Sequence, residues 1–130
     1  MSGSIASSIV VATVAAFVLS SLWYMLFGRR LAALSPAYAT GAGPSGPVVG
    51  LELLRSLVVA AVLAVLAAGG GTDSWLEGAA LGLLAWVGFP LVILAGSVLH
   101  ERYRWQLAAV HLGDWLLKLV LVAAIVSAWR

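Results

Sequence analysis

Three ionisable side chains lie close together in an apolar stretch near the end of the chain, namely His111, Asp114 and Lys118. Spacings of three and four residues place them on one face of a helix, and an acid four residues before a base is the favourable order for an ion pair. Charged groups inside a membrane span are costly and are candidates for function. We therefore interpret these residues as the centre of a candidate site.

A second apolar stretch carries its own acid and base, Glu52 and Arg55. If both stretches start on the same side of a membrane, Glu52 and His111 lie about 6 Å along their helices, and Arg55 and Asp114 about 10 Å. We predict an inward-facing intramembrane polar cluster of Glu52, Arg55, His111, Asp114 and Lys118. The alternatives are a structural ion network, or snorkelling of Arg55 and Lys118 to water.

The energetics of membrane insertion indicate where the charged face of the last stretch points. Central Asp and Lys cost about 2.5–3.5 kcal/mol each, whereas Leu, Ile, Val and Phe return about 0.3–0.6 kcal/mol each. The apolar residues of this stretch roughly cancel its two charges. The charged face should therefore turn towards protein or water and away from lipid.

Metal and enzyme motifs are weak or absent. His111 and Asp114 could supply two metal ligands, and Glu52 would have to be the third. No known ligand spacing supports that set, so we predict neither a metal nor a cofactor. The sequence has no P-loop, dinucleotide fingerprint, HExxH motif or nucleophile elbow. It has no cysteine, which excludes disulfides and cysteine metal sites.

The composition explains why embedded charges matter here. Of the 130 residues, 63% are hydrophobic and 9% are charged, and the mean hydropathy is +1.10. Soluble domains are about 45–50% apolar and about 25% charged. The chain is therefore an integral membrane protein, which argues against a soluble enzyme. A net charge of +2 is too small for a nucleic-acid partner.

Four stretches are long and apolar enough to cross a bilayer. We predict spans at 5–27, 48–68, 78–99 and 107–129, with a flexible Gly- and Pro-rich loop at 35–47. Asp73 or Ser74 could cap the third helix. Short links favour antiparallel neighbours, so we predict an all-α, single-domain protein with four transmembrane helices in an up-down antiparallel bundle.

The arginines predict the orientation. Arg29 and Arg30 lie in the first connection and Arg102 and Arg104 in the third, whereas the middle connection has no Lys or Arg and the C-terminus has only Arg130. By the positive-inside rule, loops 28–47 and 100–106 are cytoplasmic and both termini are outside. The excess of Arg over Lys, with abundant Ala, Val, Leu and Gly, suggests a bacterial source. We expect a multi-pass protein of the bacterial cytoplasmic membrane.

Small residues indicate where helices touch. A stripe at a spacing of four follows the first span, and a GxxxG pair opens the third; both allow close helix packing, within the chain or between copies. The residues are Ser8, Ala12, Ala16, Ser20, Gly78 and Gly82.

Gly88 and Pro90 predict a kink inside the third span. It could act as a hinge or cavity wall, or be a static bend. Trp86 and Trp115 lie too deep for the interfacial aromatic belt. They could line a cavity, or simply pack in the core.

Three segments resemble a known family. They are Trp23-Tyr24-Met25-Leu26-Phe27-Gly28 before Arg29, Glu77–Gly82 with Trp86-Val87-Gly88-Phe89, and Ala124–Trp129. They are similar to elements of a family of small four-helix bacterial membrane proteins, the domain of unknown function 1761. The resemblance spans nearly the whole chain and implies the fold without supplying an activity. The charged stretch Asp114–Lys118 and the Gly- and Pro-rich first loop depart from the family pattern.

Three functions remain open from the sequence. The first is binding or transport of an ion or small solute through the polar cluster, by a homo-oligomer. The second is a membrane enzyme acting on a lipid or isoprenoid-like substrate, with Asp114 or His111 as acid or base near Trp86 and Trp115. The third is an accessory subunit of a larger membrane complex. The expected partners are therefore the lipid bilayer and either further copies or another membrane protein.

Overall fold

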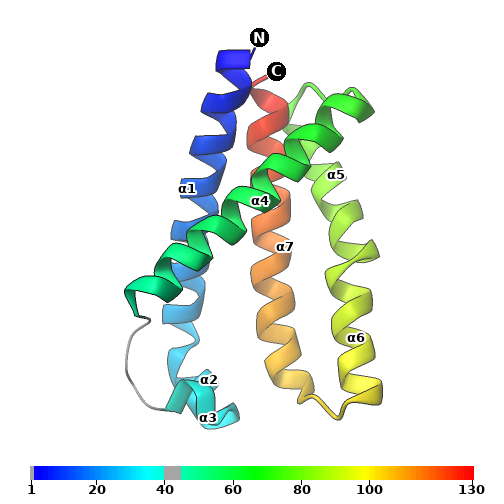
Figure 1. Cartoon of the computed structure of the whole chain (residues 1–130). Helices are drawn as coiled ribbons and strands as arrows, with labels where there is room; N and C mark the ends of the chain where they lie inside the picture. The colour runs from blue at the N-terminus through cyan, green and yellow to red at the C-terminus, as the bar shows by residue number, and fades with distance from the viewer. Residues whose placement is uncertain (1, 40–44) are drawn as a thin grey trace.

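The computed structural model describes residues 2–39 and 45–130, and these ranges are almost entirely helical (Figure 1). The helices are α1 (Ser2–Leu26), α2 (Gly28–Leu34), α3 (Pro36–Ala39), α4 (Gly46–Gly70), α5 (Trp75–Gly88), α6 (Pro90–His100) and α7 (Trp105–Ala128). No strand occurs in the described ranges.

Four segments are long and apolar enough to cross a membrane: Ile5–Leu26, Gly46–Gly70, Trp75–His100 and Trp105–Ala128. The third combines α5 and α6. An all-α protein with four membrane-length helices is therefore confirmed, and these segments overlap the four spans predicted from hydropathy.

Helix α7 is the centre of the molecule and packs against α1, α4, α5 and α6. Both termini lie at one end, which we call the terminal end; α2, α3 and the α6–α7 connection lie at the other, the loop end (Figure 1). Helix α4 crosses α1 and α7 at a steep angle, unlike the near-parallel axes of a simple up-down bundle (Figure 1). The four arginines used to predict orientation all belong to loop-end segments.

Small residues form the core where α1, α4 and α7 meet. Ala12 and Ala16 of α1 and Ala60 and Ala67 of α4 are fully buried, and they pack with Val122 of α7 in one cluster. Small side chains let membrane helices approach closely, so van der Waals contact replaces the missing hydrophobic drive. The stripe of small residues on α1 therefore packs within the chain.

Two glycines allow α5 to lie directly on α7. Gly78 and Gly82 are buried, and a Cβ at either position would overlap the backbone carbonyl of Ala123 or Leu119. Helix α5 begins at a Ser74 cap, whose hydroxyl accepts a hydrogen bond from the Glu77 N–H at 3.2 Å. We call the close contact of Gly78 and Gly82 with the α7 backbone the glycine clasp.

The predicted kink is a break between two helices. Helix α5 ends at Gly88 and α6 begins at Pro90, with Phe89 between them in a non-helical conformation. Proline lacks an N–H and suits the first position of a helix, so it ends α5 and starts α6. None of the α6 residues is buried in the chain.

The first connection is more structured than the predicted loop at 35–47. Pro36–Ala39 is a short helix, and α4 already begins at Gly46, where the Ser45 hydroxyl accepts a hydrogen bond from the Val48 N–H at 3.4 Å. Serine before a proline-containing first turn is a typical helix start. The remainder of that loop, 40–44, lies outside the described residues.

Candidate intramembrane polar site

Asp114 is the most deeply buried acid of the described chain. It lies on α7 with a relative exposure of 3%. The Ser20 hydroxyl of α1 donates a hydrogen bond of 2.6 Å to its Oδ1, and Lys118 Nζ lies 3.3 Å from its Oδ2. The carboxylate therefore links two helices and has a cationic partner one turn further along its own helix.

Lys118 is buried beside an aromatic ring. Its Nζ lies 4.3 Å from the centre of the Trp115 ring, where the ring face attracts a cation. The ion pair with Asp114 and this ring together offset the cost of removing the ammonium group from water. The sequence prediction that Asp114 and Lys118 share one face of the helix agrees with this geometry.

A second polar pair lies one helical turn closer to the loop end. Tyr24 Oη of α1 and His111 Nδ1 of α7 are 2.6 Å apart, and which atom donates depends on the histidine tautomer. The ring of Tyr103, in the α6–α7 connection, stacks on His111 with centroids 6.4 Å apart. Burial raises the pKa of Tyr103 above its usual value of 10, so that hydroxyl stays protonated at neutral pH.

The two polar pairs can form together because α1 and α7 run in opposite directions. Ser20 and Tyr24 are four residues apart on α1, and His111 and Asp114 are three apart on α7. Both spacings correspond to about one turn, so the pairs form successive contacts along one interface. We call Ser20, Tyr24, His111, Asp114 and Lys118 the polar ladder.

A tryptophan fixes the register of this interface. Trp23 Nε1 donates a hydrogen bond of 2.9 Å to the Val110 carbonyl. Gly113 leaves the room that this ring needs, because a Cβ there would overlap the Trp23 ring. Substitution of Gly113 would therefore displace Trp23 and both neighbouring polar pairs.

Glu52 and Arg55 form a separate pair. Arg55 Nη1 donates a 2.6 Å hydrogen bond to Glu52 Oε1, and their side chains are 54% and 42% exposed, respectively. Among the described residues, no hydrogen bond or ion pair joins them to His111, Asp114 or Lys118. The five residues of the predicted cluster are therefore not in mutual contact. The steep crossing of α4 is the reason, because its first turns cross α1 and not α7 (Figure 1).

The two groups still share an electrostatic environment at the loop end. Partial burial is the first cause that raises the pKa of Tyr38 on α3, and the carboxylates of Glu52 and Asp114 raise it further. Tyr38 therefore keeps its proton at neutral pH, and α3 lies within the field of both acids.

Trp86 and Trp115 pack on the core. Trp86 Nε1 donates a hydrogen bond of 2.9 Å to the Leu112 carbonyl, and Trp115 lies against Lys118. Both rings contact the main core cluster. Trp86 therefore helps to hold α5 on α7, and Trp115 covers the Lys118 ammonium group.

The sequence did not indicate that Ser20 and Tyr24 belong to the site. The small-residue stripe predicts a packing role for Ser20, and Tyr24 belongs to the segment Trp23–Gly28 that resembles the family. The available signal was the match between Ser20-x-x-x-Tyr24 and His111-x-x-Asp114 on neighbouring antiparallel helices.

The site is a closed network. Within the described residues, every buried side-chain nitrogen and oxygen has a hydrogen-bond partner, and no three His, Cys, Asp or Glu residues converge as metal ligands. Within each of its contacts, Ser20–Asp114, Asp114–Lys118 and Tyr24–His111, the polar atoms already touch, so a proton can be held there without opening the interface.

Comparison with known families covers almost all of this architecture. Residues 7–127 match the family described as "Protein of unknown function (DUF1761)". The chain belongs to the DUF1761 family. The match includes nearly all of the four membrane-length segments and the whole polar ladder, so this DUF1761 protein carries its buried charges inside the family domain. No curated protein and no solved structure matches the chain.

Proposed function

We propose that this DUF1761 protein transports protons through its polar ladder. The observation that carries the proposal is the Asp114 carboxylate, which is buried inside a membrane span between Ser20 and Lys118. The Tyr24–His111 pair lies one turn away, towards the loop end. Ionisable groups facing the interior of a membrane bundle are typical of ion and proton pathways.

The short distances favour a proton over a larger solute. The Ser20–Asp114 and Tyr24–His111 contacts are both 2.6 Å, and the Asp114–Lys118 contact is 3.3 Å. An ion or a solute would have to separate these groups, whereas a proton moves between groups that already touch. Histidine and carboxylate side chains are the usual carriers in such relays.

Proton binding would also change the packing of α7. A proton arriving from the loop end would reach His111 before Asp114, because His111 lies one turn closer to that end. Protonation of Asp114 removes the counter-charge of Lys118 and weakens a contact that holds the α7 face against α1. The ladder would thereby couple a proton to a movement between the two helices.

We further propose that copies of the chain assemble in the bacterial cytoplasmic membrane, with the loop end in the cytoplasm. The location of the four arginines at the loop end supports this orientation. The small-residue stripe is used inside the chain, so α6, which buries no residue, is the face available between copies. Because the chain lacks cysteine, Val92→Cys on α6 and Val10→Cys on α1 can compare cross-linking at two exposed positions.

Proton flux into proteoliposomes, followed with a pH-sensitive dye, tests the function. The informative variant is the double substitution Asp114→Leu/Lys118→Leu. Replacing a buried ion pair by apolar residues is often neutral for stability, so the variant should fold. We expect its flux to fall to that of empty liposomes, and that of the exposed-acid control Glu101→Gln to match the unmodified protein.

Two results would reject the proposal. One is an unmodified protein that conducts no more protons than empty liposomes under an imposed pH gradient and membrane potential. The other is a folded double variant with full flux, which would leave the ladder a purely structural network.

A further inference from the structure

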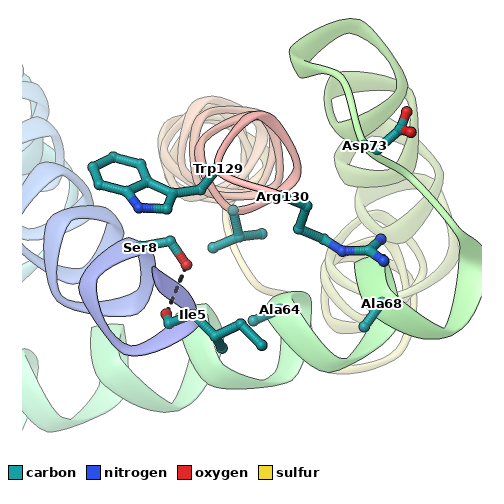
Figure 2. Close-up of a pocket in the computed structure, with 8 residues that line it drawn as sticks. Ile5, Ser8, Ala64, Ala68, Asp73, Trp129 and Arg130 are labelled. Atoms are coloured by element: carbon teal, nitrogen blue, oxygen red, sulfur yellow. Dashed lines mark hydrogen bonds between the residues drawn. The ribbon is translucent and has the colours of Figure 1, made fainter. Parts of the chain in front are cut away.

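A second feature lies at the opposite end of the molecule. A partly open cavity of about 410 Å³ lies between the start of α1, the last turns of α4 and the end of α7 (Figure 2). Small-molecule sites have volumes of about 300–1,000 Å³, so this cavity is large enough for a ligand group. It lies at the terminal end, far from the Tyr24–His111 pair at the loop end.

One side of this terminal cavity is apolar. Ile5 of α1, Ala64 and Ala68 of α4 and Val126 of α7 line it. All four belong to membrane-length segments, close to where those segments end. The lining therefore suits methylene groups at the level where a bilayer changes from hydrocarbon to headgroups.

The other side carries a fixed cation. Arg130 Nη1 donates hydrogen bonds of 2.8 Å to the Ala67 carbonyl and 2.7 Å to the Thr72 carbonyl. Cations are favourable at helix C-termini, and these two bonds hold the guanidinium at the end of α4. Its Nε–H and Nη2–H groups remain for an anion, and guanidinium groups match the geometry of phosphate.

Two further polar groups complete the rim. Trp129 is 44% exposed, its indole N–H bonds to no described residue, and its nitrogen is directed to the Ser8 side of the cavity (Figure 2). Asp73 lies in the connection between α4 and α5, and has no ion pair with a described residue. Trp129 lies on the α1 side of the cavity and Arg130 on the α4 side, and Asp73 lies beyond Arg130 in the connection that follows α4 (Figure 2).

We propose that this cavity binds the headgroup of an ethanolamine phospholipid. The phosphate accepts hydrogen bonds from Arg130, the primary ammonium donates to Asp73 beyond it, and the first methylene groups lie against Ile5 and Val126. The opposite charges of Arg130 and Asp73 complement a zwitterion, and the apolar wall complements its acyl end. This site is independent of the proton pathway.

Headgroup chemistry makes the proposal specific. A primary ammonium has three N–H donors for a carboxylate, whereas the quaternary ammonium of a choline lipid has none. An anionic glycerol headgroup would leave Asp73 without a positive partner. The cavity should therefore prefer ethanolamine over choline and glycerol lipids of the same acyl composition.

Native mass spectrometry of the full chain, released from nanodiscs of equal ethanolamine and choline phospholipid, tests the preference. We expect retained ethanolamine lipid to exceed choline lipid about tenfold, the ratio that one charge-assisted hydrogen bond supplies. Asp73→Asn should abolish this ratio and Arg130→Gln should lower retention of both lipids. The controls Glu101→Gln and Arg29→Gln, at the loop end, should change neither.

Arg130→Gln could loosen the end of α4, so Arg130→Lys provides a second test: it keeps a cation at this helix end and loses the paired N–H groups that match a phosphate. It should lower retention of both lipids without changing thermal stability. Equal retention of the two lipids by the unmodified protein, or an unchanged ratio in Asp73→Asn, would overturn the proposal. Displacement of the lipid by an equal concentration of soluble phosphoethanolamine would also overturn it, since the ligand would then be a soluble phosphate ester.

Discussion

The two halves of α7 are held in different ways. Towards the terminal end, its backbone lies against Gly78 and Gly82, and its Ser127 hydroxyl bonds to Thr72 at 2.8 Å. Towards the loop end, it contacts α1 through the Ser20–Asp114 and Tyr24–His111 pairs. The first half depends on close packing of backbones, and the second on partners that can gain or lose a proton.

This difference indicates which half can move. The glycine clasp tolerates no added volume, so α5 and α7 should behave as one unit. Helix α6 has no fully buried residue, and it begins at Pro90 directly after the break at Phe89. The break separates a helix clasped to α7 from one that contacts α7 without a buried residue, beside the loop-end half of α7.

The largest effect should come from removing one partner of the buried ion pair. Lys118→Leu leaves the Asp114 charge buried without a cation, and loss of one partner costs about 3–5 kcal/mol. We expect a corresponding fall in unfolding free energy, measured by denaturant titration in detergent. Asp114→Leu/Lys118→Leu should recover most of it. Equal losses of unfolding free energy in the single and double variants would contradict the role given to the Asp114–Lys118 ion pair.

The second-largest loss of stability should come from adding a side chain inside the glycine clasp. Gly82→Ala places a Cβ against the Leu119 carbonyl, and overpacking of this kind costs about 1–3 kcal/mol. Thermal unfolding of purified protein measures the loss. Gly96→Ala on α6 is the matched control: nothing lies within 4 Å of its Cβ, so its stability should be unchanged or increased. Similar losses at both glycines would show that helix propensity, and not the close approach, sets the effect.

A smaller and local loss of stability is expected at the Tyr24–His111 pair of the polar ladder. Tyr24→Phe removes the hydroxyl that contacts His111, and a typical hydrogen bond contributes about 0.5–1.5 kcal/mol. Hydrogen exchange should increase at the loop end of α1 and α7 and stay unchanged beside the glycine clasp. Tyr38→Phe, on the exposed α3, should leave both regions unaffected. Increased exchange throughout α7 would mean that its two halves are not independent.

The sequence predicts the elements better than their contacts. The four spans follow from length and hydropathy, and the Asp114–Lys118 pair follows from spacing along one helix. The partnership of Ser20 with Asp114 depends on the register between two helices, which close packing around Trp23 and Gly113 determines. The grouping of Glu52 with His111 assumed helices perpendicular to the membrane. Helix α4 instead crosses α1 and α7 steeply. Two residues at equal distances along α4 and α7 therefore need not lie side by side.

The smallest effect should therefore come from Glu52 and Arg55. Both side chains are largely exposed, and exposed ion pairs contribute about 0–1 kcal/mol. Arg55→Gln should leave the unfolding free energy within that range and leave proton flux unchanged, because no described contact links it to the ladder. The flux assay and denaturant titration used for Lys118→Leu measure both quantities. A fall in flux with unchanged stability would mean that Arg55 acts on His111 or Asp114 through space, and the polar site would then extend from the ladder across to α4.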